Sequence, residues 1–225
     1  MKLTIVIPVF NEASTIASVM ERVLSVALDK EIVLIDDGSS DGTTEIVDKY
    51  TSPSVKVIHK NIRQGKGAAV RTGIEHAQGD IVVIQDADLE YDPRDFLKLI
   101  DPIAEGRTDV VYGVRLLDSQ KLVMRWGNIF LTWITNRIYG QHLKDMETCY
   151  KMMKREVALS LNLECSGFDI EAEITAKLLR AGHTIHEIPI SYTARYENKK
   201  LSPFDGLPTL RALLRYCQWK PPEKI

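Results

Sequence analysis

The sequence predicts an α/β protein built on a mostly parallel β-sheet with helices on both faces. Its apolar runs, such as LTIVIPV at 3–9 and IVVI at 81–84, are continuous and rich in β-branched residues, as in strands that are covered on both faces. These runs alternate with helix-like segments, and such alternation is typical of a parallel sheet. Because the chain contains no internal repeat or low-complexity linker, we expect a single domain over 1–225.

The first half of the chain alternates regularly. Apolar residues recur at the spacing of one helical face over 16–27, and Asp92 followed by Pro93 is typical of a helix start. The loops PVFNE, DDGSSDG, NIRQGKG and DADLE then lie at the carboxyl edge of the sheet, where ligands bind in such folds. The elements expected here are strands at 3–9, 31–35, 55–59 and 81–84 and helices at 16–27, in the latter half of 61–79 with an end at Gly79, and at 92–106.

The second half is less regular, and it has room for a helical extension at its C-terminal end. Trp126, Phe130 and Trp133 are expected to pack in the core, with burial against lipid as the alternative. The elements expected here are a strand at 109–112, a loop at 113–120, a helix at 121–140, a helix at 168–182 stopped by Gly182, a strand at 184–190 and a last helix at 203–217.

Composition restricts the possible partners. The chain has 29 basic and 31 acidic residues, a net charge of −2, so nothing in its overall charge predicts binding to nucleic acid. Cys149, Cys165 and Cys217 lie far apart, and the chain begins directly with a strand, which predicts a reducing, cytoplasmic location. No run approaches the roughly 18 apolar residues of a membrane span, so the protein is expected to be soluble or peripheral at a membrane.

An acidic pair follows the strand at 81–84. Asp86 and Asp88 are two residues apart, so both carboxylates can lean the same way beyond the sheet edge. Such hard oxygen ligands suit Mg²⁺ or Mn²⁺, which is usually completed by a substrate's phosphates. The alternative is that Asp86 and Asp88 belong to a solvated loop with no ligand.

The loop DDGSSDG is interpreted either as a plain turn or as a contact for a nucleotide's base and ribose. Its position at the same edge of the sheet favours the nucleotide.

Other motifs carry less information. Gly65, Lys66 and Gly67 match neither a P-loop nor a dinucleotide fingerprint in their spacing, but a loop before a helix N-terminus can favour a nearby phosphate. His183 and His186 have no neighbours at metal-ligand spacing, so we expect them to be structural. Basic residues of the second half could be solvated or could bind phosphate oxygens; they are Arg115, Arg125, Arg195, Lys199 and Lys200.

Taken together, the segments VIPVFNE, LIDDGSSDGT, NIRQGKGAAVRTG and QDADLEYDP resemble the family 2 glycosyltransferases of GT-A fold, a Rossmann-like fold. The segments DMETCYKMMKREV and HEIPISYTAR extend the resemblance to nearly the whole chain. Within that family the chain is most similar to the polyprenyl-phosphate sugar synthases, which include the dolichol-phosphate mannose synthases. The resemblance implies a nucleotide-sugar-binding half over 1–112 and an acceptor-side half with the C-terminal tail over 113–225.

The resemblance also implies roles for individual residues. Asp86, Asp88 and Glu90 would hold the metal ion, although Glu90 stands where relatives typically have glutamine. Asp88, Arg115 and Asp145 would take part in catalysis, Arg115 facing phosphate and Asp145 lying near the acceptor. The residues implied for the nucleotide sugar are Pro8, Phe10 and Glu12 beside the nucleotide, Ile35 and Asp37 around base and ribose, Lys66, Asp86, Ala87 and Arg115, and a basic clamp of Arg195 and Lys200.

The expected reaction is the inverting transfer of mannose or glucose from a GDP- or UDP-sugar to a polyprenyl phosphate, with Mg²⁺ or Mn²⁺ as cofactor. A lipid phosphate is already largely dianionic at neutral pH and needs no general base, whereas a hydroxyl acceptor would require one, a role open to Asp145. A lipid acceptor implies peripheral membrane contact or a membrane partner subunit. The candidate surfaces are 121–140 and the helix that ends in RALLRYCQW.

Three alternatives remain at this point. The nearest is the same enzyme class with a glycan or small-molecule hydroxyl as acceptor. A sugar-phosphate nucleotidyltransferase would need a glycine-rich stretch with Arg and Lys after the first strand, and PVFNEAS has none. A non-catalytic scaffold subunit would tolerate loss of the acidic pair, but Asp86 and Asp88 are both present.

Overall fold

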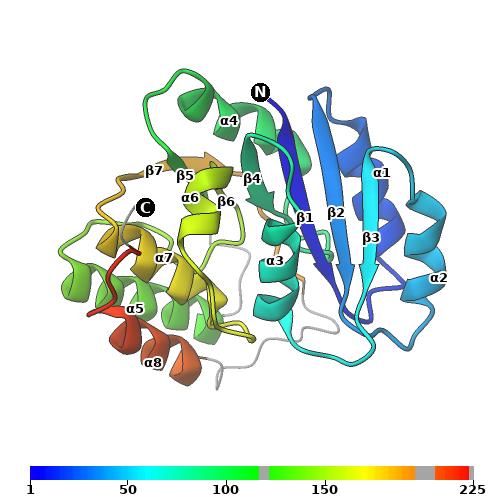
Figure 1. The fold of residues 1–225 in the computed structure, drawn as a ribbon. Helices are drawn as coiled ribbons and strands as arrows, with labels where there is room; N and C mark the ends of the chain where they lie inside the picture. Colours follow the sequence, from blue (N-terminus) through cyan, green and yellow to red (C-terminus); the bar gives the residue numbers. More distant parts are fainter. Residues whose placement is uncertain (117–121, 196–205, 223–225) are drawn as a thin grey trace.

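The computed structural model describes residues 1–116, 122–195 and 206–222, and it contains a seven-stranded sheet in the order β3-β2-β1-β4-β6-β5-β7 (Figure 1). Neighbouring strands are parallel except for β6, which is antiparallel to both β4 and β5. This confirms the α/β class and the mostly parallel sheet. The strands are β1 (Leu3–Val9), β2 (Lys30–Asp36), β3 (Val55–His59), β4 (Ile81–Ile84), β5 (Val110–Arg115), β6 (Lys151–Lys154) and β7 (Ile185–Ile190).

Helices cover both faces of the sheet (Figure 1). The chain steps from β1 to β2 to β3 in one direction and then returns to β4, so right-handed connections put α1 and α2 on one face and α3 on the other. The helices are α1 (Ile16–Ser25), α2 (Thr43–Val47), α3 (Lys66–Glu75), α4 (Phe96–Ala104), α5 (Leu122–Tyr139), α6 (Arg155–Ser160), α7 (Ile170–Arg180) and α8 (Gly206–Tyr216), with short 3₁₀ turns at Asp48–Tyr50 and Pro93–Asp95.

The central strands are buried on both faces, as their continuous apolar sequence predicts. All four residues of β4 are buried, and β1 is buried at every position except Pro8. Helix α3 packs unusually close to this layer, because a Cβ on Gly73 would come within 2.3 Å of a methyl carbon of Val6. This close approach fixes the height of α3 over β1, and so the position of Lys66 at its first turn.

Several predicted boundaries were wrong. Helix α3 ends at Glu75 rather than at Gly79, whose N–H donates instead to Thr4 Oγ1 over 2.9 Å. Strand β5 continues to Arg115, through part of the segment predicted as a loop. The sequence analysis also missed α2, β6 and α6. Each of these three has six residues or fewer, too few for a hydrophobic period to be recognised.

Antiparallel β6 has a direct effect on the carboxyl edge of the sheet. Its Met152 pairs with Val83 of β4 on one side and Val111 of β5 on the other. Because β6 runs opposite to these strands, its beginning lies where they end. The segment 141–150 therefore reaches the same edge as the loops that follow β1, β2 and β4. The Asn136 side chain holds this segment by bonding both the N–H and the C=O of Leu143, each over 2.8 Å.

Helix α5 is apolar on a face that points to solvent. Trp126, Phe130 and Trp133 are 67%, 54% and 57% exposed, so the prediction that they pack in the core was wrong. The helix buries Thr132 and Thr135 instead, on its opposite side. Among the described residues, no helix is both long and apolar enough to cross a lipid bilayer.

Candidate active site

A cavity of about 400 Å³ lies at the carboxyl edge of the sheet, between the loops after β1, β2 and β4 on one side and α5 and the start of α7 on the other. Its position agrees with the general rule for open α/β sheets. Most of the residues predicted for the site line it: Pro8, Phe10, Glu12, Asp37, Lys66, Asp86, Ala87, Asp88, Glu90, Arg115 and Arg195.

Two predicted site residues, Ile35 and Asp145, do not line the cavity in the described structure. Ile35 is fully buried within β2, where it belongs to the apolar core. Asp145 is only 1% exposed and lies behind the cavity wall, bound to Arg115. Lys200 lies outside the described residues. The roles of Ile35 and Lys200 beside the nucleotide stay predictions.

The two carboxyl groups of the acidic pair after β4, Asp86 and Asp88, have pKa values shifted in opposite directions. Lys66 Nζ lies 2.8 Å from Asp86 Oδ1. Burial has the largest single effect and raises the pKa of Asp86, but Lys66, together with Cys149 and Arg115, outweighs it, so the pKa is lowered. Asp88 accepts a hydrogen bond from the N–H of Glu90 over 3.1 Å. Burial, followed by the charges of Asp86 and Glu90, raises the pKa of Asp88 to about 7. A further cation is therefore favoured beside Asp88.

Glu90 faces the loop that carries Arg195. Its Oε2 accepts a hydrogen bond from Tyr192 Oη over 2.7 Å, and its Oε1 accepts one from the N–H of Arg195 over 2.8 Å. Within the ranges that the structure describes, no group of three His, Cys, Asp or Glu side chains is arranged to hold a metal ion. Asp86 and Asp88 fit a divalent ion as two carboxylate ligands, with a diphosphate to supply others. Glu90 as a third ligand stays a prediction.

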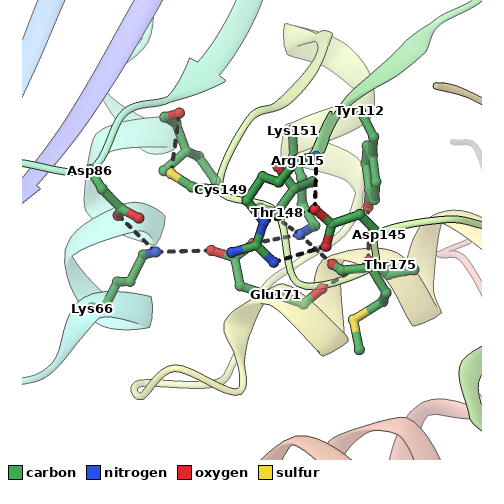
Figure 2. Close-up of polar contacts among 12 residues, drawn as sticks. Lys66, Asp86, Tyr112, Arg115, Asp145, Thr148, Cys149, Lys151, Glu171 and Thr175 are labelled. Carbon is green, nitrogen blue, oxygen red and sulfur yellow. Dashed lines mark hydrogen bonds and ion pairs between the residues drawn. The ribbon is translucent and has the colours of Figure 1, made fainter. Parts of the chain in front are cut away.

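A chain of alternating charges connects the acidic pair to the segment before β6 (Figure 2). Lys66 contacts Asp86 and also Glu171 Oε1, at 3.0 Å. The other oxygen of Glu171 lies 2.7 Å from Lys151 Nζ, which is completely buried. Lys151 in turn donates to the C=O of Met146 over 2.8 Å. The network therefore fixes the segment 141–150 relative to Asp86.

Arg115 and Asp145 form a second buried pair, from the end of β5 to the same segment (Figure 2). Arg115 Nε and Nη2 donate to the two oxygens of Asp145 over 2.7 and 2.8 Å. The side chains are 8% and 1% exposed. Because its carboxylate is engaged in this pair, Asp145 is poorly placed to accept a proton from an acceptor hydroxyl.

On the side of β1 and β2, Asp37 accepts hydrogen bonds from the N–H groups of Gln64 and Gly65 over 2.9 and 2.7 Å, which fixes the loop before α3. This loop places the Arg63 guanidinium 4.4 Å from the centre of the Phe10 ring. Arg63 and Phe10 both line the cavity, and together they form a flat, cationic surface that is suited to a nucleobase.

Across the cavity, Arg195 donates to both oxygens of Glu12 over 2.7 and 2.9 Å. Thr15 Oγ1 lies within hydrogen-bonding distance of two acceptors, Glu12 Oε2 at 2.8 Å and the C=O of Ala87 at 2.7 Å. Arg195 and Glu12 both line the cavity, so this pair joins the loops after β1, β4 and β7 around one space.

Several residues that line the cavity were not predicted. Arg63 could have been found, because it lies in the same loop as Lys66. Glu147, Phe168 and Glu171 gave no signal. Glu171 lies in what reads as an amphipathic helix, and Glu147 lies in the irregular segment before the unpredicted β6.

The fold is that of the GT-A glycosyltransferases, and the cavity lies at the sheet edge where such folds bind ligands. Glucosyl-3-phosphoglycerate synthase from Mycobacterium tuberculosis has the same fold, with a TM-score of 0.76 at 23% identity over 96% of this chain and 80% of that chain. That synthase has been crystallised with Mn²⁺ and UDP-glucose, and with Mg²⁺ and UDP. The present chain belongs to glycosyl transferase family 2, whose sequence profile matches residues 4–160. The predicted family and fold are confirmed.

Three relatives cover most of the chain. Glycosyltransferase AglJ of Haloferax volcanii is 33% identical over 85% of this chain and 63% of its own length. A dolichol-phosphate mannosyltransferase of Pyrococcus furiosus is 29% identical over 98% of this chain and 65% of its own length. An undecaprenyl-phosphate mannosyltransferase of Micrococcus luteus is 26% identical over 87% and 85%. The chain thus spans slightly less than two thirds of the first two relatives.

Proposed function

We propose that the protein is an inverting, metal-dependent hexosyltransferase that moves mannose or glucose from a GDP- or UDP-sugar to a polyprenyl phosphate. The observation that carries the proposal is the composition of the cavity. It combines a carboxylate pair, Asp86 and Asp88, with the cations Lys66, Arg115 and Arg195. Such a set suits a diphosphate bound through a divalent ion, and family membership supports a nucleotide sugar as its source.

The proposed reaction makes one bond and breaks one. An oxygen of the acceptor phosphate attacks the anomeric carbon of the hexose from the side opposite the leaving group, and the bond to the nucleoside diphosphate breaks, with its electron pair leaving on the diphosphate oxygen. Asp86 and Asp88 would hold Mg²⁺ or Mn²⁺, which supplies charge neutralisation at the diphosphate. Arg115 and Arg195 add fixed positive charge at the cavity wall, where negative charge develops on the leaving group.

The state of Asp145 favours a phosphate acceptor over a hydroxyl acceptor. A hydroxyl must lose a proton as it attacks, and Asp145, the residue expected to accept it, is buried and ion-paired with Arg115. A lipid phosphate, with a second pKa of about 6, is already mostly dianionic at neutral pH and needs no base. The names of two relatives, which are dolichol- and undecaprenyl-phosphate mannosyltransferases, support the same choice.

The exposed apolar side of helix α5 is an independent observation in support of a lipid acceptor. Its solvent-facing side carries an apolar stripe, defined here as Leu122, Trp126, Ile129, Phe130 and Trp133. Other residues of the same helix, Met124 and Asn128, line the cavity. We infer that the stripe meets a membrane surface or a membrane partner subunit, so that a lipid phosphate could enter the cavity beside α5 while its chain stays in the apolar phase.

The first experiment measures transfer of labelled hexose from GDP-mannose and from UDP-glucose into organic-extractable product. Each donor is tested with undecaprenyl phosphate, and with Mg²⁺, Mn²⁺ or EDTA. The expected result is label in the lipid phase from one donor, lost in EDTA. Label that appears only in water-soluble glycans would instead establish the hydroxyl-acceptor alternative. No transfer from either donor, under conditions in which the donor binds, would contradict the lipid-phosphate acceptor.

A further inference from the structure

Glu147 lines the cavity, and its Oε1 is buried without a hydrogen-bond partner in the part of the chain that the structure describes. A carboxylate oxygen in this state is costly, because it has lost its water and nothing replaces it. Native proteins contain few such atoms, and each one calls for an explanation. A ligand that donates hydrogen bonds to Glu147 would provide one.

The charged groups around Glu147 come from three other elements and its own segment. Burial has the largest effect on its pKa; Lys151 and Arg115 favour the carboxylate, whereas Glu171 and Asp145 oppose it. The two cations are already paired, Lys151 with Glu171 and Arg115 with Asp145. The balance raises the pKa of Glu147 to about 7. A neutral donor of hydrogen bonds is therefore the missing partner, since no unengaged cation is supplied by these neighbours.

The strand order gives the position of Glu147 along the cavity. Asp37, Phe10 and Arg63 belong to the side of β1 and β2, and the acidic pair follows β4. Glu147 precedes β6, on the other side of β4. A nucleotide sugar laid along this edge, with its diphosphate at Asp86 and its base over Phe10, extends its hexose toward β6 and β5.

The charge and hydrogen-bonding capacity of Glu147 also favour the hexose as its partner. A phosphate group would be repelled by the Glu147 carboxylate, and the nucleobase lies on the far side of the acidic pair. A hexose is uncharged and rich in O–H donors, so it can satisfy the buried oxygen. We propose that Glu147 binds hydroxyl groups of the donor's hexose and contributes to the choice of hexose. This inference rests on the proposed function.

The test compares the affinity for a nucleotide sugar with that for its nucleoside diphosphate, by calorimetry in Mg²⁺. GDP-mannose is measured against GDP, and UDP-glucose against UDP, for the wild type, Glu147→Ala and Glu147→Gln. Glu156→Gln, at an exposed glutamate of α6, serves as the control. We expect Glu147→Ala to weaken binding of the preferred nucleotide sugar roughly 10- to 100-fold and to leave the diphosphate unchanged. Glu147→Gln, which keeps one acceptor oxygen, should lose less.

A second readout is proton release. Near pH 7 about half of the unliganded Glu147 is protonated, and hydrogen bonds from hydroxyl groups favour the carboxylate. Binding of the nucleotide sugar should therefore release up to about half a proton more than binding of the diphosphate, as seen in buffers of different ionisation enthalpy. Glu147→Gln should abolish this difference, which a residue that only shapes the loop would leave in place.

The outcomes separate this inference from the proposed function. If the wild type binds neither nucleotide sugar, both are overturned. If the wild type binds one of them and Glu147→Ala keeps the wild-type ratio of affinities, only the hexose contact is wrong. Normal donor binding with slow transfer in Glu147→Ala would also overturn the hexose contact, because it would place Glu147 at the acceptor instead. A variant that loses both ligands equally would mean a structural role.

Discussion

Arg115 holds Asp145 through three hydrogen bonds: from Nε and Nη2 of its guanidinium and from its own main-chain N–H. The residues come from the last position of β5 and from the segment before β6, and both side chains are nearly inaccessible to water. The pair therefore joins two chain segments at the wall of the cavity. This contact fixes the position of Asp145, whose role near the acceptor stays a prediction.

Asp145→Asn should lower the free energy of unfolding by about 3–5 kcal/mol, because it leaves the buried Arg115 guanidinium without its counter-charge. Urea unfolding measures the loss. Asp109→Asn is the matched control, since it removes a carboxylate that pairs with Lys154 at the surface, 42% and 32% exposed. The control should cost less than about 1 kcal/mol. Equal, small losses in the two variants would contradict a buried pair.

Asp86→Asn and Asp88→Asn should each lower hexose transfer by roughly 100-fold or more, because the diphosphate would lose part of its ion-mediated stabilisation. Both residues face the cavity, and Lys66 keeps Glu171 as an ion-pair partner when Asp86 is replaced, so both variants should stay folded. Asp101→Asn, at an exposed position of α4, should leave transfer unchanged. Full activity in either site variant would rule out the carboxylate pair as metal ligands.

Replacing Trp126, Phe130 and Trp133 together by serine should abolish association with phospholipid vesicles, as measured by co-sedimentation. All three are more than half exposed, so each change should alter the free energy of unfolding by about 0.5 kcal/mol or less. Leu24→Ser and Leu97→Ser, at exposed apolar positions on α1 and α4, are the controls and should keep vesicle binding. Unchanged binding in the triple variant would disprove the membrane role of the stripe.

His59 should make stability depend on pH near neutrality. Burial lowers its pKa, but hydrogen bonds to Asp36 and Asp48, at 3.2 and 2.9 Å, outweigh burial and raise it above 6.5. The protonated imidazole is therefore favoured in the folded state. Its contribution is complete below about pH 6.5 and is lost as pH rises through the folded pKa.

The measurement is the free energy of unfolding of wild type and His59→Gln between about pH 5.5 and pH 8.5, a range that brackets the ordinary histidine pKa. Asp88 and Glu147 titrate in the same range, so the difference between the two proteins isolates His59. This difference should shrink as pH rises. A difference independent of pH would show that His59 does not change its protonation on folding.

Much of the part of the chain that contains β1 to β4 could be predicted from sequence. Strands β1, β3 and β4 have the predicted bounds: β1 and β4 are uninterrupted apolar or β-branched runs, and β3 is a short segment in which Val55, Val57 and Ile58 are apolar. The parallel topology then places the loops after β1, β2 and β4 at one edge, which is why Asp37, Asp86 and Asp88 line one cavity as expected. Pattern and topology together were sufficient there.

The part of the chain that follows β5 could not be predicted to the same depth. The segment KMMK has no recognisable strand period, so antiparallel β6 was missed, and with it the reason that Glu147 reaches the cavity. Burial of Asp145 depends on Arg115, thirty positions away in the chain. No local sequence pattern identifies a partner that is so distant in the chain. Aromatic residues on α5 have the spacing of a core face but point outward, because Thr132 and Thr135 occupy the buried side.

The reversed direction of β6 has a consequence for how the cavity can change. The loops after β1, β2 and β4 run on into helices, so a change in their length disturbs the packing that follows. Residues 141–150 instead lead into the beginning of a strand. They are held at three points, at Leu143 by Asn136, at Asp145 by Arg115 and at Met146 by Lys151. A substitution at one of these points would therefore reshape the cavity wall beside β5 and β6, whereas the loops after β1 and β2 keep contacts that do not involve this segment.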